Sequence, residues 1–237
     1  MNKSIKKKPP VICIDGPSAS GKGEISRRVA KKLGYHLLDS GMLYRILALE
    51  VDRRGFDLED RVALLNLVTR LEIQFGGGSN CADAVKLNGE DVSFDIRTDK
   101  ISKFASKIAG IPSVREALLN RQIAFRVPPG LVADGRDMGS VVFPDAEVKI
   151  FLTASPIARA ERRYKQLIGK GINVNLSDVF DDLVERDERD KERPLSPLRV
   201  SKESIVIDST RLSVEQVVTH LMNLIASKKI ADNVGDQ

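Results

Sequence analysis

The sequence predicts an α/β fold in which helices cover both faces of a five-stranded parallel sheet. Three observations lead to this prediction. Short apolar segments alternate with amphipathic segments along most of the 237-residue chain, as in parallel strands joined by helices. The strand-like segments are apolar at almost every position, which is typical of strands buried on both faces. A segment of period two near residues 70–95 predicts a small antiparallel sheet inserted into this frame.

Five apolar segments are expected to form the core strands. They cover residues 11–15, 35–39, 131–134, 147–153 and 204–208. Their carboxyl ends would meet at one edge of the sheet, where ligands bind in parallel sheets. The residues at that edge are Asp15, Asp39, Asp134, Thr153 and Asp208. Carboxylates suit a site for phosphates, magnesium and hydroxyls. Aspartate also favours turns, and this structural interpretation is preferred for Asp208.

The amphipathic segments between these strands are expected to be helices. They begin at Lys22 and Ser40, cover 58–70, resume near Lys100, follow Ser113, Ser155 and Ser213, and include a charged helix over 178–193. Ser113 and Ser213 have Glu or Gln three residues later, which is the pattern of a capping box. Ser155 precedes a proline, a favourable N-cap and first-turn pair.

The inserted segment contains two turn signals. Gly76–Asn80 is rich in glycine and predicts a flexible turn, and Asn88-Gly89 is a strong hairpin signal. We therefore expect an antiparallel patch over residues 70–95 within the α/β chain.

The composition, with 42% hydrophobic residues and a net charge of +5, predicts an ordinary globular protein. Cys13 and Cys81 are far apart and form no metal-binding spacing, so no metal-ligating residues are assigned. No signal-peptide-like or membrane-spanning segment is apparent, which favours a cytoplasmic monomer without a membrane partner. Four lysines, at positions 3, 6, 7 and 8, mark residues 1–9 as a flexible basic tail. Nucleic-acid binding through this tail is a weak alternative, and no nucleic-acid partner is expected.

The most informative segment is a glycine-rich loop between the first predicted strand and helix. Its residues are Gly16, Pro17, Ser18, Ala19, Ser20, Gly21, Lys22, Gly23 and Glu24. The G-x-x-x-x-G-K pattern in a strand–loop–helix context predicts a loop whose backbone N–H groups bind phosphates. The helix start and Lys22 add positive charge. A chance glycine-rich turn is the alternative interpretation, which the flanking strand and helix disfavour.

Arginines follow several of the expected strands and suggest a second phosphate site. Arg45 lies one turn into the helix that begins at Ser40, and Arg136 follows the strand 131–134. Arg186, Asp190 and Arg193 share one face of the charged helix by their spacing.

For each single arginine a surface ion pair is the simpler explanation. The charged helix likewise resembles an exposed face, with Glu185–Arg189 and Asp187–Lys191 as expected pairs. No nucleophile–histidine arrangement for covalent chemistry is apparent, and the two histidines are interpreted as structural. Phosphoryl transfer needs no such arrangement, because alignment and charge neutralisation supply most of the catalysis.

Taken together, several segments resemble the bacterial cytidylate kinases. They are residues 11–45, 131–152 and 185–198, with the hairpin segment 87–93 and Ile96-Arg97-Thr98 matching the insert typical of that family. The resemblance runs from about residue 10 to residue 225. It implies a P-loop nucleoside monophosphate kinase fold that transfers phosphate from ATP, with Mg²⁺, to CMP or dCMP.

The resemblance also implies roles for individual residues. The loop 16–24 would bind ATP phosphates together with Arg162, and Lys22, Arg136 and Arg186 would be catalytic. The implied acceptor-binding residues are Ser40, Tyr44, Arg45, Ser106, Arg115, Arg136, Asp137, Arg186, Asp190 and Arg193. Within that set, Ser106, Arg115 and Asp137 would read cytosine, and Arg186 and Asp190 would lie near the sugar. Arg159, Arg162 and Arg163 would begin a lid that reaches the transferring phosphate on closing.

The implied organisation has three parts besides the tail. A core domain comprises residues 10–39, 127–155 and 200–237, a monophosphate-binding region comprises 40–126, and the lid comprises 156–199.

One position departs from the family pattern. A hydroxyl residue is usual at one of the two positions after the loop lysine, but this chain has Gly23 and Glu24. Either Glu24 faces away and Asp15 or Asp134 holds Mg²⁺ through water, or its charge repels phosphate. We favour the first hypothesis.

The sequence disfavours two other functions. A kinase for UMP or a non-nucleotide acceptor is disfavoured by the insert and by the Ser106, Arg115 and Asp137 set. A nucleotide-dependent switch or binding protein is disfavoured because the N-K-x-D motif of guanine-specific switches is absent from the sequence, and because the arginines would then have no role.

Overall fold

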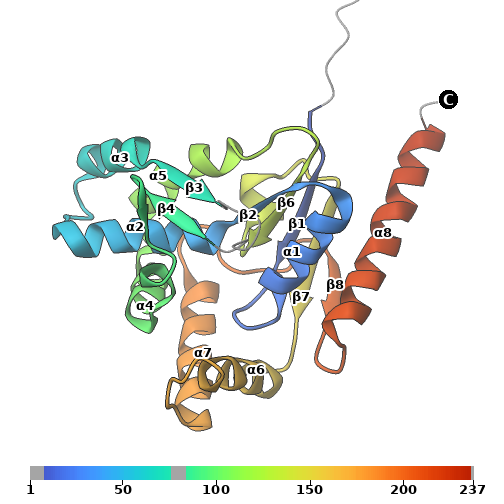
Figure 1. Ribbon diagram of the computed structural model, residues 1–237. Coiled ribbons are helices and arrows are strands. Elements are labelled where there is room, and N and C mark those ends of the chain that lie inside the picture. Colours follow the sequence, from blue (N-terminus) through green and yellow to red (C-terminus); the bar gives the residue numbers. More distant parts are fainter. Residues whose placement is uncertain (1–7, 76–83, 236–237) are drawn as a thin grey trace, which may run out of the picture. The chain divides into compact units, whose positions relative to one another are not determined.

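The computed structural model describes residues 8–75 and 84–235, with side chains described up to Lys228. The chain divides into two compact units (Figure 1), a first unit of residues 1–39 and 123–237 and a second unit of residues 40–122. The predicted turn at Gly76–Asn80, together with Cys81 and three of the four tail lysines, lies outside the described residues.

A five-stranded sheet forms the centre of the first unit, in the order β2-β6-β1-β7-β8. The strands are β1 (Val11–Asp15), β2 (His36–Asp39), β6 (Leu131–Gly135), β7 (Val148–Thr153) and β8 (Ile205–Asp208). All neighbouring pairs are parallel, which confirms the prediction. Strand β1 lies at the centre of the sheet, between β6 and β7. Its five residues are all buried, as expected for a central parallel strand.

Two helices cover one face of this sheet, α1 (Lys22–Leu33) and α8 (Val214–Gly235). Figure 1 shows them side by side next to the strands. Their apolar residues, among them Ile25, Val29 and Leu221, pack with Ile14 and Ile150 of the sheet in one buried cluster. The opposite face receives the short helix η2 (Met138–Val142).

The start of α8 has the predicted capping box. The Gln216 N–H donates to Ser213 Oγ over 3.2 Å, and the Ser213 N–H donates to Gln216 Oε1 over 2.8 Å. Within the described part of the chain, no helix has both the length and the apolar run that crossing a bilayer requires.

A helical pair, α6 (Pro156–Ile168) and α7 (Leu176–Glu192), follows β7 in the first unit. Ser155 Oγ accepts a hydrogen bond from the Ala158 N–H, so the predicted N-cap is confirmed. The two helices pack on one another through a small apolar cluster formed by Ala160, Leu167, Val179 and Leu183. This apolar cluster holds α6 against α7.

The second unit combines helices with a three-stranded antiparallel sheet. Its helices are α2 (Ser40–Arg54), α3 (Arg61–Arg70), η1 (Asp95–Arg97), α4 (Asp99–Ile108) and α5 (Pro112–Ile123), and its strands are β3 (Ile73–Phe75), β4 (Val85–Leu87) and β5 (Glu90–Asp91). Asn88 and Gly89 join β4 to β5 with φ values of 49° and 87°, as a tight hairpin requires. The predicted antiparallel insert is therefore confirmed.

Two predicted helix starts in the second unit are wrong. Helix α3 begins at Arg61 rather than at residue 58, because Asp60 caps it by accepting from the Ala63 N–H over 2.9 Å. Helix α5 begins at Pro112, whose fixed φ suits a first helical turn. Ser113 is thus inside the helix and not its cap, and its hydroxyl donates to the Leu58 carbonyl over 3.3 Å.

Candidate functional site

The glycine-rich loop leads from the end of β1 into α1, as predicted. Gly16 has a φ of +150°, and a Cβ there would come within 2.0 Å of the Leu152 carbonyl oxygen of β7. Gly21 precedes α1 with a left-handed φ of +96°. Only glycine fits both positions without displacing backbone. The loop conformation is therefore specified by these two residues.

Lys22 is buried at the first turn of α1, where its Nζ donates to the Pro17 carbonyl over 2.8 Å. Burial lowers the pKa of the lysine, and the nearby guanidinium groups of Arg136 and Arg186 lower it further, while Asp134 opposes the shift. Three of the predicted catalytic cations therefore lie within electrostatic reach of one another, although two come from other elements. A site with such concentrated positive charge attracts polyanions.

Two carboxylates at the edge of the sheet have different tasks. Asp15 accepts hydrogen bonds from the Met138 and Gly139 N–H groups, each over 2.9 Å. Burial raises its pKa to about 6, against the effect of these two donors. Asp15 thus fixes the start of η2. This bonding makes it a weaker choice than Asp134 for holding a metal-bound water.

Asp134 is the better candidate for holding a hydrated cation. Its Oδ2 lies 3.5 Å from the position that a Cβ would take at Gly23, so the carboxylate is beside the phosphate loop. Burial raises its pKa, Lys22 lowers it, and Asp39 raises it further. A divalent cation would add to the charge compensation that Lys22 and Arg136 already give this carboxylate. In residues 8–75 and 84–228 no group of three or more His, Cys, Asp or Glu side chains is placed to hold a metal ion.

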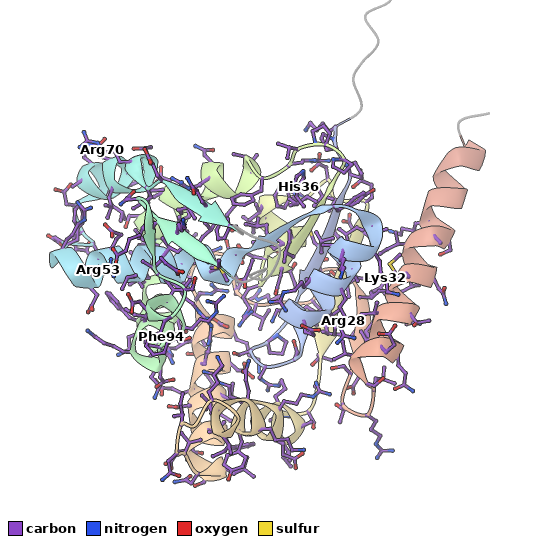
Figure 2. The ribbon with its side chains drawn as sticks, in the orientation of Figure 1. Arg28, Lys32, His36, Arg53, Arg70 and Phe94 are labelled. Carbon is purple, nitrogen blue, oxygen red and sulfur yellow. The ribbon has the colours of Figure 1, made fainter. Side chains whose placement is uncertain are left out.

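Glu24 faces the surface and not the loop. Its carboxylate accepts from Arg27 Nη1 over 2.8 Å and from Arg28 Nε over 2.6 Å. Arg28 also pairs with Glu215 of α8 over 3.1 Å. Figure 2 shows Arg28 and Lys32 along α1 on the side toward α8. The charge of Glu24 is thus neutralised away from the phosphate-binding backbone.

Arg136 and Asp190 form a buried ion pair in the first unit. Arg136 follows β6, and its Nε donates to Asp190 Oδ2 of α7 over 2.8 Å. Burial alone would raise the pKa of Asp190, but Arg136, Arg193 and Arg186 together hold it below the usual value. Because β6 is the neighbour of β1, Arg136 directly follows the strand that lies beside the one leading into the phosphate loop.

The charged helix differs from its predicted form in two ways. Arg193 lies one residue beyond α7, which ends at Glu192, although it stays buried with Nε 3.4 Å from the Asp190 carbonyl oxygen. The expected pair Asp187–Lys191 is wrong, because Asp187 is buried and pairs with Arg159 Nη2 over 2.6 Å. The expected surface pair Glu185–Arg189 is present, at 3.6 Å.

Two of the three predicted lid arginines are engaged with the loop backbone, whereas Arg163 Nη1 donates to Gln166 Oε1 over 3.0 Å. Arg159 donates to the Ser18 carbonyl over 3.2 Å, and Arg162 donates to the Ser20 carbonyl over 3.3 Å. Arg162 also contacts Ser209, directly after β8, with 3.1 Å between Nη1 and Oγ. The sequence interpretation missed Ser209. The rule that ligands gather at strand ends would have pointed to it, one residue beyond Asp208.

One of the remaining strand-end residues fits the sequence interpretation. Asp208 is exposed, and its Oδ1 accepts from the Thr210 N–H over 2.8 Å, so its role is to form a turn. Asp137 is buried directly before η2.

The second unit holds the other predicted acceptor-binding residues. Ser40 is the first residue of α2, and Tyr44 is buried one turn later. The Arg115 guanidinium of α5 lies 5.9 Å from the centre of the Tyr44 ring, and its Nη1 donates to the Ala109 carbonyl over 3.1 Å. Ser106 is buried on α4, and Arg45 is half-buried on α2. The structure therefore brings Tyr44 and Arg115 together within this unit.

Comparison with known proteins gives a consistent result. A family model described as cytidylate kinase matches residues 12–227. A cytidylate kinase of Pseudomonas fluorescens strain Pf-5 is 51% identical over 225 residues, covering 94% of this chain and 98% of the relative. A cytidylate kinase of Vibrio parahaemolyticus serotype O3:K6 is 49% identical over 219 residues, covering 92% of this chain and 96% of the relative. A cytidylate kinase of Chromobacterium violaceum is 50% identical over 220 residues, covering 93% of this chain and 97% of the relative. This chain belongs to the cytidylate kinase family.

Proposed function

We propose that this chain transfers the γ-phosphoryl group of ATP to the phosphate of CMP or dCMP, forming ADP and the nucleoside diphosphate. The observation that carries the proposal is the phosphate loop with Lys22, Arg136 and Arg186 in one electrostatic cluster at the carboxyl edge of a parallel sheet. A loop with a single lysine suffices to bind a nucleotide. The additional guanidinium groups suit a reaction in which two phosphate groups must be brought together.

The residues divide the work as follows. The N–H groups of the loop and the start of α1 bind the donor phosphates. Lys22 neutralises the β- and γ-phosphates when their charge raises its pKa. Arg136 and Arg186 neutralise the charge that spreads over the transferring group, and their effect is strong because the surroundings are buried. No protein nucleophile takes part, since the phosphate oxygen of the acceptor attacks in line.

Mg²⁺, when bound, would supply positive charge that neutralises the donor phosphates. Asp134 would hold it through water, because this carboxylate is buried beside the loop. Glu24 would take no part, because Arg27 and Arg28 bind its carboxylate.

Acceptor recognition is proposed from the family resemblance, residue by residue. Ten residues would bind CMP. Those of the first unit are Arg136, Asp137, Arg186, Asp190 and Arg193, and those of the second unit are Ser40, Tyr44, Arg45, Ser106 and Arg115. Ser106, Arg115 and Asp137 would read the cytosine. Arg162 would contact the donor nucleotide once residues 156–199 close as a lid, excluding water so that ATP is not hydrolysed. We place the enzyme in the cytoplasm as a monomer.

The proposal is tested by incubating the protein with ATP and MgCl₂ and with CMP, dCMP or UMP, and separating the products by anion exchange. CDP and dCDP are expected. Lys22→Met serves as the inactive comparison, because it keeps the length of the side chain and removes the charge. It should reduce turnover by at least about a hundredfold while the circular dichroism spectrum stays unchanged. ATP binding by the wild-type chain without formation of any diphosphate from CMP would contradict the proposal.

A further inference from the structure

Arg159 is a buried arginine whose guanidinium is shared among three elements. Its Nε donates to the Ala154 carbonyl, just after β7, over 3.1 Å, and its Nη1 donates to the Ser18 carbonyl of the phosphate loop over 3.2 Å. Its Nη2 pairs with Asp187 Oδ2 of α7 over 2.6 Å. The residue is only 4% exposed. Arg159 therefore connects the phosphate loop to α7 through one rigid planar group.

The contact with the loop fixes the direction of a phosphate-binding donor. The Ser18 carbonyl and the Ala19 N–H belong to one planar peptide group and point in opposite directions. Because Arg159 holds the carbonyl, the Ala19 N–H must point away from α6. Ala19 has a φ of +58°, a conformation that a non-glycine residue adopts only when its surroundings impose it. Arg159 is one part of those surroundings.

The contact with α7 fixes the residues proposed to bind the acceptor. Asp187 directly follows Arg186 in sequence and lies one helical turn before Asp190. A shift of α7 along its axis relative to Arg159 would displace both residues. Asp190 in turn holds Arg136, over 2.8 Å. The chain of contacts thus runs from the loop carbonyl through Arg159 and Asp187 to the arginines that surround Lys22.

The ion pair is not needed to join α6 to α7. The apolar cluster of Ala160, Leu167, Val179 and Leu183 already joins the two helices. A buried ion pair is also a poor source of stability, since desolvation of both charges offsets their attraction, and an apolar pair of similar volume often serves as well. The Arg159–Asp187 pair must therefore be explained by what it orients.

We propose that Arg159 and Asp187 are positioning residues that couple nucleotide binding at the loop to the placement of Arg186 and Asp190 on α7. Donor phosphates that hold the Ala19 N–H also hold the Ser18 carbonyl on Arg159, which keeps α7 in the register that the acceptor requires. The inference rests on the proposed function, because it concerns binding of both substrates. Neither residue contacts substrate in this role.

The decisive variant is the double substitution Arg159→Met/Asp187→Asn, which removes both charges and stays close to the volume of each side chain. It should remain folded, with a melting temperature moderately below that of the wild type, because Met cannot donate to the Ala154 and Ser18 carbonyls. Calorimetry then measures the dissociation constants of CMP and of a non-hydrolysable ATP analogue with Mg²⁺, each alone and in the presence of the other.

For the wild type we expect CMP to bind at least about fivefold more tightly when the analogue is present. In the double variant the coupling should fall to a factor near one. Arg159→Lys keeps the charge but lacks the planar fork, and should lose most of the coupling as well. Glu185→Gln, on the exposed side of α7, should keep it.

Coupling that survives in the double variant and in Arg159→Lys would overturn the inference, as would a wild type that binds both ligands without coupling. A purely structural role would lower the melting temperature and weaken each ligand alone without changing the coupling factor. Failure of the proposed function is a different result, in which the wild type does not phosphorylate CMP. If it nevertheless binds CMP and the analogue, the coupling measurement tests the positioning role unchanged.

Discussion

The buried pair of Arg136 and Asp190 allows the sharpest quantitative prediction. Asp190→Asn keeps the shape of the side chain and removes its charge, leaving the guanidinium of Arg136 buried at 18% side-chain exposure. Removing one member of a buried ion pair costs about 3–5 kcal/mol, because the other charge is left uncompensated. Since Arg136 retains some contact with solvent, we expect the lower end, about 3 kcal/mol. At roughly 2–4 °C per kcal/mol, the melting temperature should fall by about 6–12 °C.

The pH dependence of this effect has a definite sign. Burial opposes ionisation of Asp190, but Arg136, Arg193 and Arg186 hold its folded pKa below the unfolded value. The unfolded state therefore binds more protons in that window, so the contribution of Asp190 is complete above pH of about 4 and is lost as pH falls through the folded pKa. The difference in the free energy of unfolding between the wild type and Asp190→Asn should be the same at pH 7 and pH 5.5. It should become smaller at lower pH.

Urea unfolding followed by circular dichroism measures both predictions. Glu185→Gln on the same helix is the matched control, because its pair with Arg189 is exposed and 3.6 Å long. It should change the free energy of unfolding by no more than about 0.5 kcal/mol. If Asp190→Asn cost no more than this control at pH 7, the pair would not be the buried, desolvated contact described here.

Three further predictions concern other parts of the site. Glu24→Thr should change the Michaelis constant for MgATP by less than about tenfold, because Arg27 and Arg28 hold the carboxylate away from the loop; a tenfold or larger decrease would show that Glu24 repels the donor. Arg186→Ala should reduce turnover of CMP by at least about a hundredfold and leave ATP binding measured without CMP almost unchanged, and a parallel loss of ATP binding would refute the assigned role. The pKa of Asp15 is raised from 3.8 to about 6, so the folded state keeps a proton that the unfolded state loses, and stability should fall by roughly 2 kcal/mol between pH 4 and pH 6. In urea unfolding, the stability of Asp15→Asn should not decline over this pH range. If the free energy of unfolding of the variant fell with pH as steeply as that of the wild type, the Asp15 carboxyl would not be the cause of the decline.

The core of the fold could be predicted from the sequence because its signals are local. The strands β1, β6 and β7 are buried along almost their whole length, as their continuous apolar sequences predict. The edge strands β2 and β8 are only partly buried, but their short apolar segments still predict strands. The left-handed positions at Gly16, Gly21 and Gly89 were predictable for the same reason, since turn chemistry depends on few residues. Helix starts were less certain, because Pro112 and Ser113 are both good first-turn residues and tertiary contacts decided between them.

The candidate site was predictable only in part, because burial of charge depends on distant partners. Asp187 has the spacing of a surface ion pair with Lys191, and nothing near it in sequence points to Arg159, 28 residues earlier. Arg159 likewise resembles the other lid arginines until its position against Ser18 and Ala154 is known. The orientation of Glu24 also could not be derived from its position after the loop, since it depends on Arg27 and Arg28.

The central claim is that the phosphate loop and the arginines around it serve transfer to CMP and not nucleotide binding alone. The direct measurement is ADP release from MgATP by the purified full-length chain, with and without CMP, in a coupled assay. We predict rapid ADP release that requires CMP and yields an equal amount of CDP, with little release from ATP alone. ADP release that is independent of CMP, or its absence in the presence of CMP, would contradict the account.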